Sequence, residues 1–139
     1  MADPTDHGRN PFVTDIEAAT LGNSNFRTTL WTGAHLQLTV MSIPPGGDIG
    51  LEVHEENDQF LRVEQGRGRC EMGATEAKLD FVEEVADDDI ILVPAGFWHN
   101  VTNIGDDDLK VYVLYGPADH DPGTIHPTQD DAEADPHEH

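Results

Sequence analysis

GLEVHEENDQFLRVEQGRG, residues 50–68, has the pattern of a strand, a polar turn and a second strand. Side chains two positions apart on a strand point to the same face, so Glu52 and His54 are expected to lie together. A half-buried strand normally places apolar residues at such positions. Here the chain places two groups that bind protons or metal ions, which suggests a chemical role for this face.

Short apolar stretches separated by Gly, Pro and Asp turns continue on both sides of this segment. In residues 35–43, Leu36, Leu38 and Val40 alternate with polar residues, as in a half-buried strand. IILV, residues 90–93, is wholly apolar and predicts a buried strand, whereas residues 15–19 allow at most a short helical turn. This pattern predicts an all-β antiparallel sandwich or barrel. The expected strands are 26–32, 35–43, 49–54, 59–65, 69–72, 77–85, 90–93, 100–104 and 109–115.

The 139 residues suffice for one core but not for two. Residues 1–24 contain scattered Asp, Pro, Asn and Gly and are expected to form a flexible arm, and residues 25–116 form the barrel domain. Residues 117–139 are rich in Asp, His, Pro and Glu, which predicts an extended, partly disordered acidic tail. Within it HDPGTIH, residues 120–126, could instead fold back over the barrel mouth.

The charge is strongly acidic, with 28 Asp and Glu against 7 Lys and Arg and a formal net charge of -21. Such a chain repels phosphate backbones, so a nucleic-acid partner is not expected. The acidic runs at 87–89 and 106–108 fall in turns within the domain, so the charge is not confined to the tail. Self-repulsion of this size favours a salt-rich, halophilic setting, in which ions screen the surface.

Membrane and disulfide signals are weak in this sequence. No apolar run approaches the roughly 20 residues that span a bilayer. The first twelve residues lack the apolar region of a signal peptide, and Cys70, the only cysteine, excludes an intrachain disulfide. We therefore expect a cytoplasmic protein without a membrane partner, in which Cys70 is a small packing residue.

Two sets of residues at fixed spacing carry the most specific signal. The first is Gly46, five residues, Glu52, one residue, His54, four residues, Gln59, six residues and Gly66. The second is Asp88, five residues, Pro94-x-Gly96, two residues, His99, three residues and Asn103. These sets resemble the two signature motifs of the cupin superfamily over about residues 35–115. The resemblance implies a jelly-roll β-barrel, also described as a double-stranded β-helix or RmlC-like barrel.

Cupins carry inward-facing metal ligands at four of these positions. The resemblance implies one divalent metal held by Glu52, His54, Gln59 and His99. Three positions depart from the usual pattern: Glu52 replaces a histidine, Gln59 a glutamate and Asp88 a glycine. Pairing His54 with Glu56 instead loses the required separations, so we exclude that alternative.

Two imidazoles and one carboxylate leave open positions on an octahedral metal, as in non-haem iron oxygenases, and also suit Mn, Zn, Cu or Ni. We therefore expect a metal-dependent enzyme for a small oxygenated metabolite, using dioxygenase-like or Lewis-acid chemistry. Glu52 and His99 are the candidate catalytic residues, Glu52 acting as ligand or as general base. The alternative is a non-catalytic barrel that binds a metal or a metabolite, in which the substituted positions form hydrogen bonds only.

A closer resemblance is to small bacterial and archaeal cupins described as mannose-6-phosphate isomerase-like, through NFRTTLWTG (25–33), VPAGFWHNV (93–101) and GTIHPT (123–128). It implies a third function, sugar-phosphate isomerase, which would need cations for the phosphate. Arg62, Arg67 and Arg69 are the candidates. The resemblance also implies a homodimer in which strand 26–32 adds to a partner's sheet.

The remaining histidines and aromatic residues have simpler interpretations. His35 is expected to face solvent from a strand. The histidines of the arm and tail are expected to be solvated: His7, His120, His126, His137 and His139. The aromatic residues are expected to pack in the core or to line a cavity: Phe60, Phe97, Trp98, Tyr112 and Tyr115.

Overall fold

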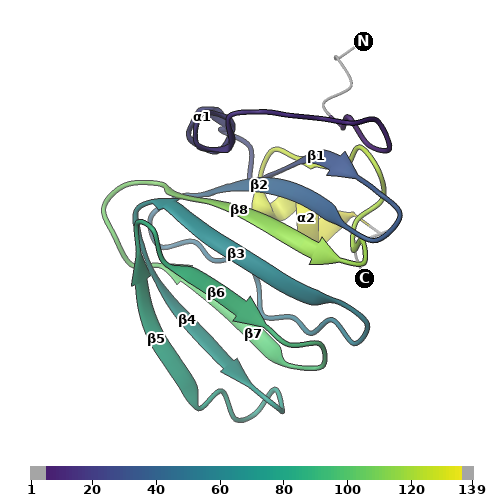
Figure 1. Cartoon of the computed structure of the whole chain (residues 1–139). Coiled ribbons are helices and arrows are strands. Elements are labelled where there is room, and N and C mark those ends of the chain that lie inside the picture. The colour runs from purple at the N-terminus through teal and green to yellow at the C-terminus, as the bar shows by residue number, and fades with distance from the viewer. Residues whose placement is uncertain (1–5, 136–139) are drawn as a thin grey trace.

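The computed structural model describes residues 6–135, which fold into two antiparallel β-sheets and two short helices (Figure 1). The larger sheet has the strand order β6-β3-β8-β2-β1-β9 and the smaller one β5-β4-β7. The strands are β1 Arg27–Thr32, β2 Gln37–Ile43, β3 Asp58–Gln65, β4 Arg67–Gly73, β5 Phe81–Ala86, β6 Ile90–Val93, β7 Trp98–Asn103, β8 Leu109–Gly116 and β9 Ile125–His126. The predicted all-β jelly roll is confirmed.

Alternation along the paired strands separates a buried face from an outer face. On the buried face, Leu61 and Val63 of β3 pair with Val113 and Val111 of β8, and all four are essentially inaccessible to solvent. Met41 of β2 pairs with Val111 and extends this layer. The core therefore lies between the two sheets, and the inward positions of β3, β7 and β8 point toward it.

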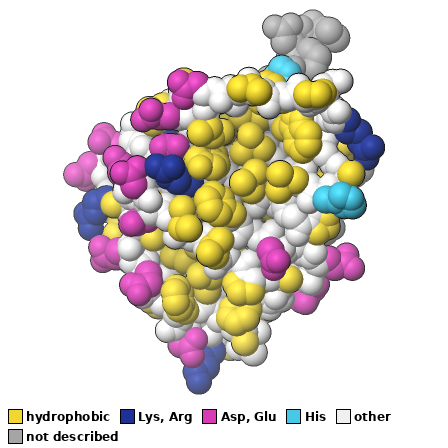
Figure 2. Space-filling view, in the orientation of Figure 1, with side chains coloured by type: hydrophobic (Ala, Val, Ile, Leu, Met, Phe, Trp, Pro, Cys, Tyr) yellow, Lys and Arg dark blue, Asp and Glu magenta, His cyan; other side chains and the backbone are white. Residues whose placement is uncertain are grey.

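The outer face of the larger sheet is apolar as well. One row of paired residues runs across five strands, from Trp31 through Leu38, Leu114 and Phe60 to Leu92. Figure 2 shows hydrophobic side chains gathered over this face. Leu92 is 63% exposed, so the prediction that 90–93 is fully buried was wrong at alternate positions, because β6 is an edge strand. The outer row leaves an apolar surface on the molecule.

Residues 49–54 do not form the regular strand that the sequence predicts. Gly50, with φ of +93°, interrupts the extended backbone. Two isolated bridges attach the segment to β7, Asp48 to Thr102 and Glu52 to His99. This bridged segment, residues 48–54, therefore runs beside β7 without forming a regular strand.

The tail expectation also differs from the structure. Strand β9 pairs with Arg27 and Thr28 of β1, and helix α2, Gln129–Ala134, begins with a capping box of Thr128 and Asp131. The tail histidines expected to be solvated, His120 and His126, are buried, at 6% and 3% exposure. His126 accepts from Arg27 at 3.0 Å through Nδ1, and its Nε2 donates to Asp135 at 3.0 Å. Residues 120–126 thus fold back onto the barrel.

The arm contributes helix α1, Ile16–Gly22, which Asp15 caps and which lies against β2, β3 and β8. Neither helix of the described residues has the length or the apolar character to cross a membrane. His137 and His139, which were also expected to be solvated, lie outside the described residues. The predicted division into an arm of residues 1–24, a domain of 25–116 and a tail of 117–139 stays a prediction.

The two motifs are recognisable in the backbone as left-handed turns. Gly46, Gly66 and Gly96 have φ of +80°, +100° and +84°, and Asp88 has φ of +75° at the remaining motif position. Only glycine adopts this region without steric cost, and Asp tolerates it better than most other residues. The turn geometry therefore matches the spacing of the motifs, including the position where Asp88 replaces glycine.

Replacing Asp88 by glycine is expected to give a more stable protein than replacing it by alanine, by about 1 kcal/mol. Both variants lose the ion pair of Asp88 with Arg62, at 2.7 Å, so the difference reports the strain of alanine at positive φ, reduced by the greater unfolded-state entropy of glycine. Chemical denaturation of the two variants measures it. Equal stabilities would show that this turn does not require the left-handed conformation.

Candidate metal centre

The backbone brings Glu52 and His99 face to face. The Glu52 N–H donates to the His99 carbonyl at 3.1 Å, and the His99 N–H donates to the Glu52 carbonyl at 2.9 Å. Residues that exchange both hydrogen bonds are direct cross-strand neighbours, so their side chains lie on one face. His54 follows two residues later on the bridged segment, and β7 turns His99 inward beside Val101.

The three side chains converge at one point inside the barrel. Ligand atoms of Glu52, His54 and His99 all lie within 4.8 Å of one another. Glu52 Oε1 is 3.1 Å from His54 Nε2 and 3.8 Å from His99 Nε2. The two imidazole rings are 5.3 Å apart between centroids and tilted by 44°. Two ring nitrogens thus face one carboxylate oxygen, a donor set suited to a divalent transition metal.

The tautomer of His99 is fixed by its surroundings. Its Nδ1 lies 3.1 Å from the Phe97 carbonyl oxygen, which can only accept, so Nδ1 carries the proton. Burial lowers the pKa of His99 and favours the neutral ring. Nε2 then presents a lone pair, and it is a buried atom without a hydrogen-bond partner among residues 6–135. This is the form in which histidine binds metals.

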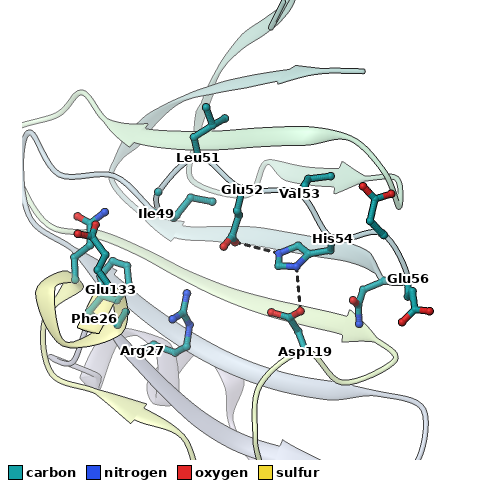
Figure 3. Close-up of a pocket in the computed structure, with 15 residues that line it drawn as sticks. Phe26, Arg27, Ile49, Leu51, Glu52, Val53, His54, Glu56, Asp119 and Glu133 are labelled. Atoms are coloured by element: carbon teal, nitrogen blue, oxygen red, sulfur yellow. Dashed lines mark hydrogen bonds and ion pairs between the residues drawn. The ribbon is translucent and has the colours of Figure 1, made fainter. Parts of the chain in front are cut away.

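His54 lies between two carboxylates. Its Nε2 is 3.1 Å from Glu52 and its Nδ1 is 3.0 Å from Asp119 (Figure 3). Burial lowers the pKa of His54, but the hydrogen bonds to Asp119 and Glu52 outweigh this effect and raise the pKa to about 10. In this arrangement His54 is an imidazolium whose Nε2 proton points at Glu52, so a cation at this point would replace that proton.

The two carboxylates stay ionised for a related reason. Burial alone would raise the pKa of Glu52, but its hydrogen bond to His54 and the nearby positive charge lower it. The pKa of Asp119 is lowered in the same way by His54, against its own burial. Both groups therefore carry negative charge near neutral pH, as metal ligation or hydrogen-bond acceptance from His54 requires.

Gln59, the fourth predicted ligand, is a buried inward-facing amide. It begins β3 beside Asp58, pairs with Tyr115 of β8 and is 4% exposed. Its Oε1 is a buried atom that has no hydrogen-bond partner within the described part of the chain. Buried amide oxygens normally have partners, so this one is available to a ligand. Its coordination of a metal stays a prediction.

A cavity of about 710 Å³ opens beside this cluster. Glu52 and His54 form part of its wall together with Arg27 and with Asp119, which contacts His54 (Figure 3). His99 is 1% exposed and lies behind them. The remaining described wall residues come from the position before β1, from the bridged segment and its continuation, and from α2: Phe26, Ile49, Gly50, Leu51, Val53, Glu55, Glu56, Asn57, Gln129, Ala132 and Glu133.

Arginines proposed from the sequence for a phosphate lie elsewhere. Arg62, Arg67 and Arg69 do not belong to the described wall of the cavity, and each lies within 4 Å of an acidic side chain. Among the described wall residues Arg27 is the one arginine or lysine, and it contacts His126. The cavity is therefore predominantly acidic.

The simpler interpretations of other residues are mostly supported. His7 and His35 are exposed, but His35 lies in the connection between β1 and β2 and not on the expected strand. Burial raises the pKa of Cys70 to about 11, as expected for a packing residue. Tyr115 is buried with its ring edge against His54, whereas Tyr112 contacts Phe60 on the outer face.

Sequence reasoning missed Asp119 and Arg27. Neither belongs to a motif, and Asp119 stands in a segment expected to be an extended tail. The only available signal was the possibility that the tail folds back over the barrel mouth. The contact of Asp119 with His54 depends on that fold-back.

Comparisons with known proteins agree with this geometry. A cupin-domain family model matches residues 39–115, more than half of the chain. The chain is 54% identical to the protein YrkC of Bacillus subtilis over 93% of its length and 69% of that protein. It is 37% identical to protein L612 of Acanthamoeba polyphaga mimivirus, over 82% of this chain and 70% of that protein.

Solved structures give the same result. The crystal structure of BH2720 from Bacillus halodurans superposes with a TM-score of 0.93 at 56% identity, over 94% of this chain and 99% of that one. KdgF from Halomonas sp. superposes with a TM-score of 0.59 at 20% identity, over 66% of this chain and 79% of that one, which shows a shared fold only. From its motifs, its sheet topology and these matches, the chain belongs to the cupin family.

Proposed function

We propose that this protein holds one divalent transition metal at Glu52, His54 and His99, and that Gln59 supplies a fourth, neutral oxygen. The observation that carries the proposal is the convergence of two ring nitrogens and a carboxylate oxygen within 4.8 Å. The unpartnered His99 Nε2 and Gln59 Oε1 support it, because buried polar atoms without partners are costly unless a ligand satisfies them. Fe, Mn, Zn, Cu and Ni all suit these donors.

We further propose that the protein is an enzyme for a small oxygenated metabolite. Bound at this centre, the metal would supply Lewis acidity or activate dioxygen. The cavity gives a substrate access to the face formed by Glu52 and His54, while buried His99 holds the far side. Ionised Glu52, with about a third of its side chain exposed, could accept a substrate proton if it leaves the metal.

Metal analysis of untagged protein purified in high salt tests the first step. We expect about one equivalent of a transition metal and a melting temperature that rises when metal is added to chelator-treated protein. Oxygen uptake with a panel of small enols and thiols then tests the enzymatic step. If metal binds but no substrate reacts, the non-catalytic binding barrel is the better description; if no metal binds, the metal proposal fails.

The sugar-phosphate isomerase ranks below these functions. A phosphate would need cationic partners, and Arg62, Arg67 and Arg69 lie outside the described cavity wall. Conversion of mannose-6-phosphate to fructose-6-phosphate, lost in a folded His99→Ala variant, would restore this function to first place.

The proposed homodimer needs a different interface from the one expected. The β1 edge is already paired with β9 at Arg27 and Thr28, so strand addition there is obstructed by the chain's own tail. The apolar outer row from Trp31 to Leu92 offers an alternative face. Two copies of a chain with a net charge of -21 repel each other. An interface formed by this uncharged face keeps the acidic groups of the two copies apart.

Leu92→Asp is expected to convert the proposed dimer into a monomer, because it buries a charge in an apolar contact. Light scattering in high salt measures the mass. Val82→Asp is the matched control, since Val82 is 50% exposed on the smaller sheet. A wild-type protein that is monomeric at working concentration would refute the dimer.

A further inference from the structure

Residues 117–120 form a strap that the side chains of buried Gln37 and half-buried Asn57 hold in place. Gln37, fully buried on β2, accepts from the N–H of Asp119 at 3.1 Å and of His120 at 2.9 Å. The Gln37 amide group also donates to the His120 carbonyl at 2.8 Å. Asn57 donates to the carbonyls of Pro117 and Ala118. These contacts fix the backbone of the strap on both sides of Asp119.

The strap also has a side-chain anchor at its far end. His120 is 6% exposed, and its Nε2 lies 3.1 Å from the Tyr115 hydroxyl. The His120 ring packs edge-on against Tyr115, and Tyr115 packs edge-on against His54. A barrel residue, a strap residue and the candidate ligand therefore form one packed group.

Held in this way, Asp119 directs one oxygen at the candidate ligand. Asp119 Oδ1 is 3.0 Å from His54 Nδ1, on the side of the ring opposite Glu52 (Figure 3). The carboxylate can only accept, so Nδ1 carries a proton and Nε2 is the nitrogen left for a metal. The Asp119 side chain is only 20% exposed, which limits competition from water for this bond.

We propose that Asp119 is a positioning residue of the metal centre: it holds the ring of His54 so that Nε2 points at Glu52 and His99. The proposal rests on the proposed metal site and adds a component from outside the matched cupin segment, which ends at residue 115. A carboxylate behind a ligating histidine fixes its tautomer and orientation and makes it more basic. The strap thus completes a site whose ligands all come from the barrel.

Asp119→Ala is expected to weaken metal binding about 10–100-fold, the usual effect of removing such a partner. Co²⁺ alone is the metal used, titrated by calorimetry into chelator-treated full-length protein. Asp119→Asn is expected to bind with intermediate affinity, because its amide oxygen still accepts from Nδ1 but lacks the charge. Asp121→Ala removes the same charge from an exposed position two residues along and should change the affinity less than about twofold.

A second measurement keeps the proposal separate from the metal site itself. Nitrogen-15 NMR of the His54 ring in chelator-treated protein is expected to show a protected Nδ1 proton in the wild type and its loss in Asp119→Ala. If wild-type protein binds no Co²⁺, the proposed function fails, and the NMR signal alone decides whether Asp119 holds His54. Equal Co²⁺ affinities of the wild type and a folded Asp119 variant, or an unchanged ring spectrum in folded Asp119→Ala, would overturn the positioning role. Should Asp119→Ala not fold, the isosteric Asp119→Asn decides by its Co²⁺ affinity, because its amide oxygen keeps the bond to Nδ1 and leaves the ring spectrum similar.

Discussion

Replacing His99 by asparagine is expected to abolish divalent-metal binding while the protein stays folded. His99 supplies one of the two ring nitrogens of the cluster, and its Nε2 has no other partner among the described residues. The asparagine amide can still donate to the Phe97 carbonyl as Nδ1 does, at 3.1 Å. The substitution thus removes the nitrogen that would face the metal and keeps the bond that orients the side chain.

His99→Asn is expected to lower the Co²⁺ affinity by more than about 100-fold. That value is the upper end of the effect of removing a residue that only supports a metal ligand. Calorimetric titration and the metal content of purified protein both measure the loss. The smaller side chain leaves space at a position 1% exposed, so we also expect a stability cost of about 1–2 kcal/mol. His35→Asn, on an exposed turn, is the control for losing a histidine as such. A folded His99→Asn protein with wild-type affinity would remove His99 from the site.

The sequence was most informative where backbone geometry is local. A positive φ at Gly46, Gly66 and Gly96 is a requirement of single turns, so the spacing of these glycines could be read directly. The turns then place His54 and His99 at defined points, and their convergence follows from antiparallel pairing. Fold class and the core of the candidate site were accessible for this reason.

Long-range features were not accessible in the same way. The composition of the tail indicated an extended chain, yet β9 and α2 form because His126 and Ala132 find burial against the barrel. Propensity is weak for such short elements, and tertiary contacts decide their structure. Asp119 joins the site through long-range hydrogen bonds of its strap, such as that to Gln37, 82 positions away, and no local pattern encodes them.

In residues 49–54 the predicted convergence of Glu52 and His54 is present, but its structural cause differs from the predicted one. The sequence predicted that Glu52 and His54 share a face because they belong to a strand. They do converge, at 3.1 Å, but on an irregular segment that only Glu52 and Asp48 bridge to β7. The convergence therefore depends on the two bridges to His99 and Thr102 and not on the alternation of side chains along a regular strand. Strand β7 thus sets the positions of Glu52 and His54.

The acidic surface predicts a large effect of salt on stability. The acidic turns 87–89 and 106–108 are exposed, and the formal net charge is -21. The Debye length falls from about 30 Å at 0.01 M salt to about 3 Å at 1 M, so repulsion between these groups is largely removed in molar salt. We expect a gain of a few kcal/mol, which corresponds to a rise in melting temperature on the order of 10 °C.

Thermal unfolding in NaCl from 0.01 to 2 M measures this rise. Screening by NaCl acts on charge, whereas sucrose at matched osmolality acts through exclusion from the surface, so sucrose separates the two causes. Replacing all three aspartates of 106–108 by asparagine should raise stability at low salt and flatten the curve, because those charges repel one another in one exposed turn. A melting temperature that stays flat from dilute buffer to molar salt would contradict a halophilic adaptation. In that case the acidic surface would have to serve another purpose, such as keeping the apolar outer face from non-specific association.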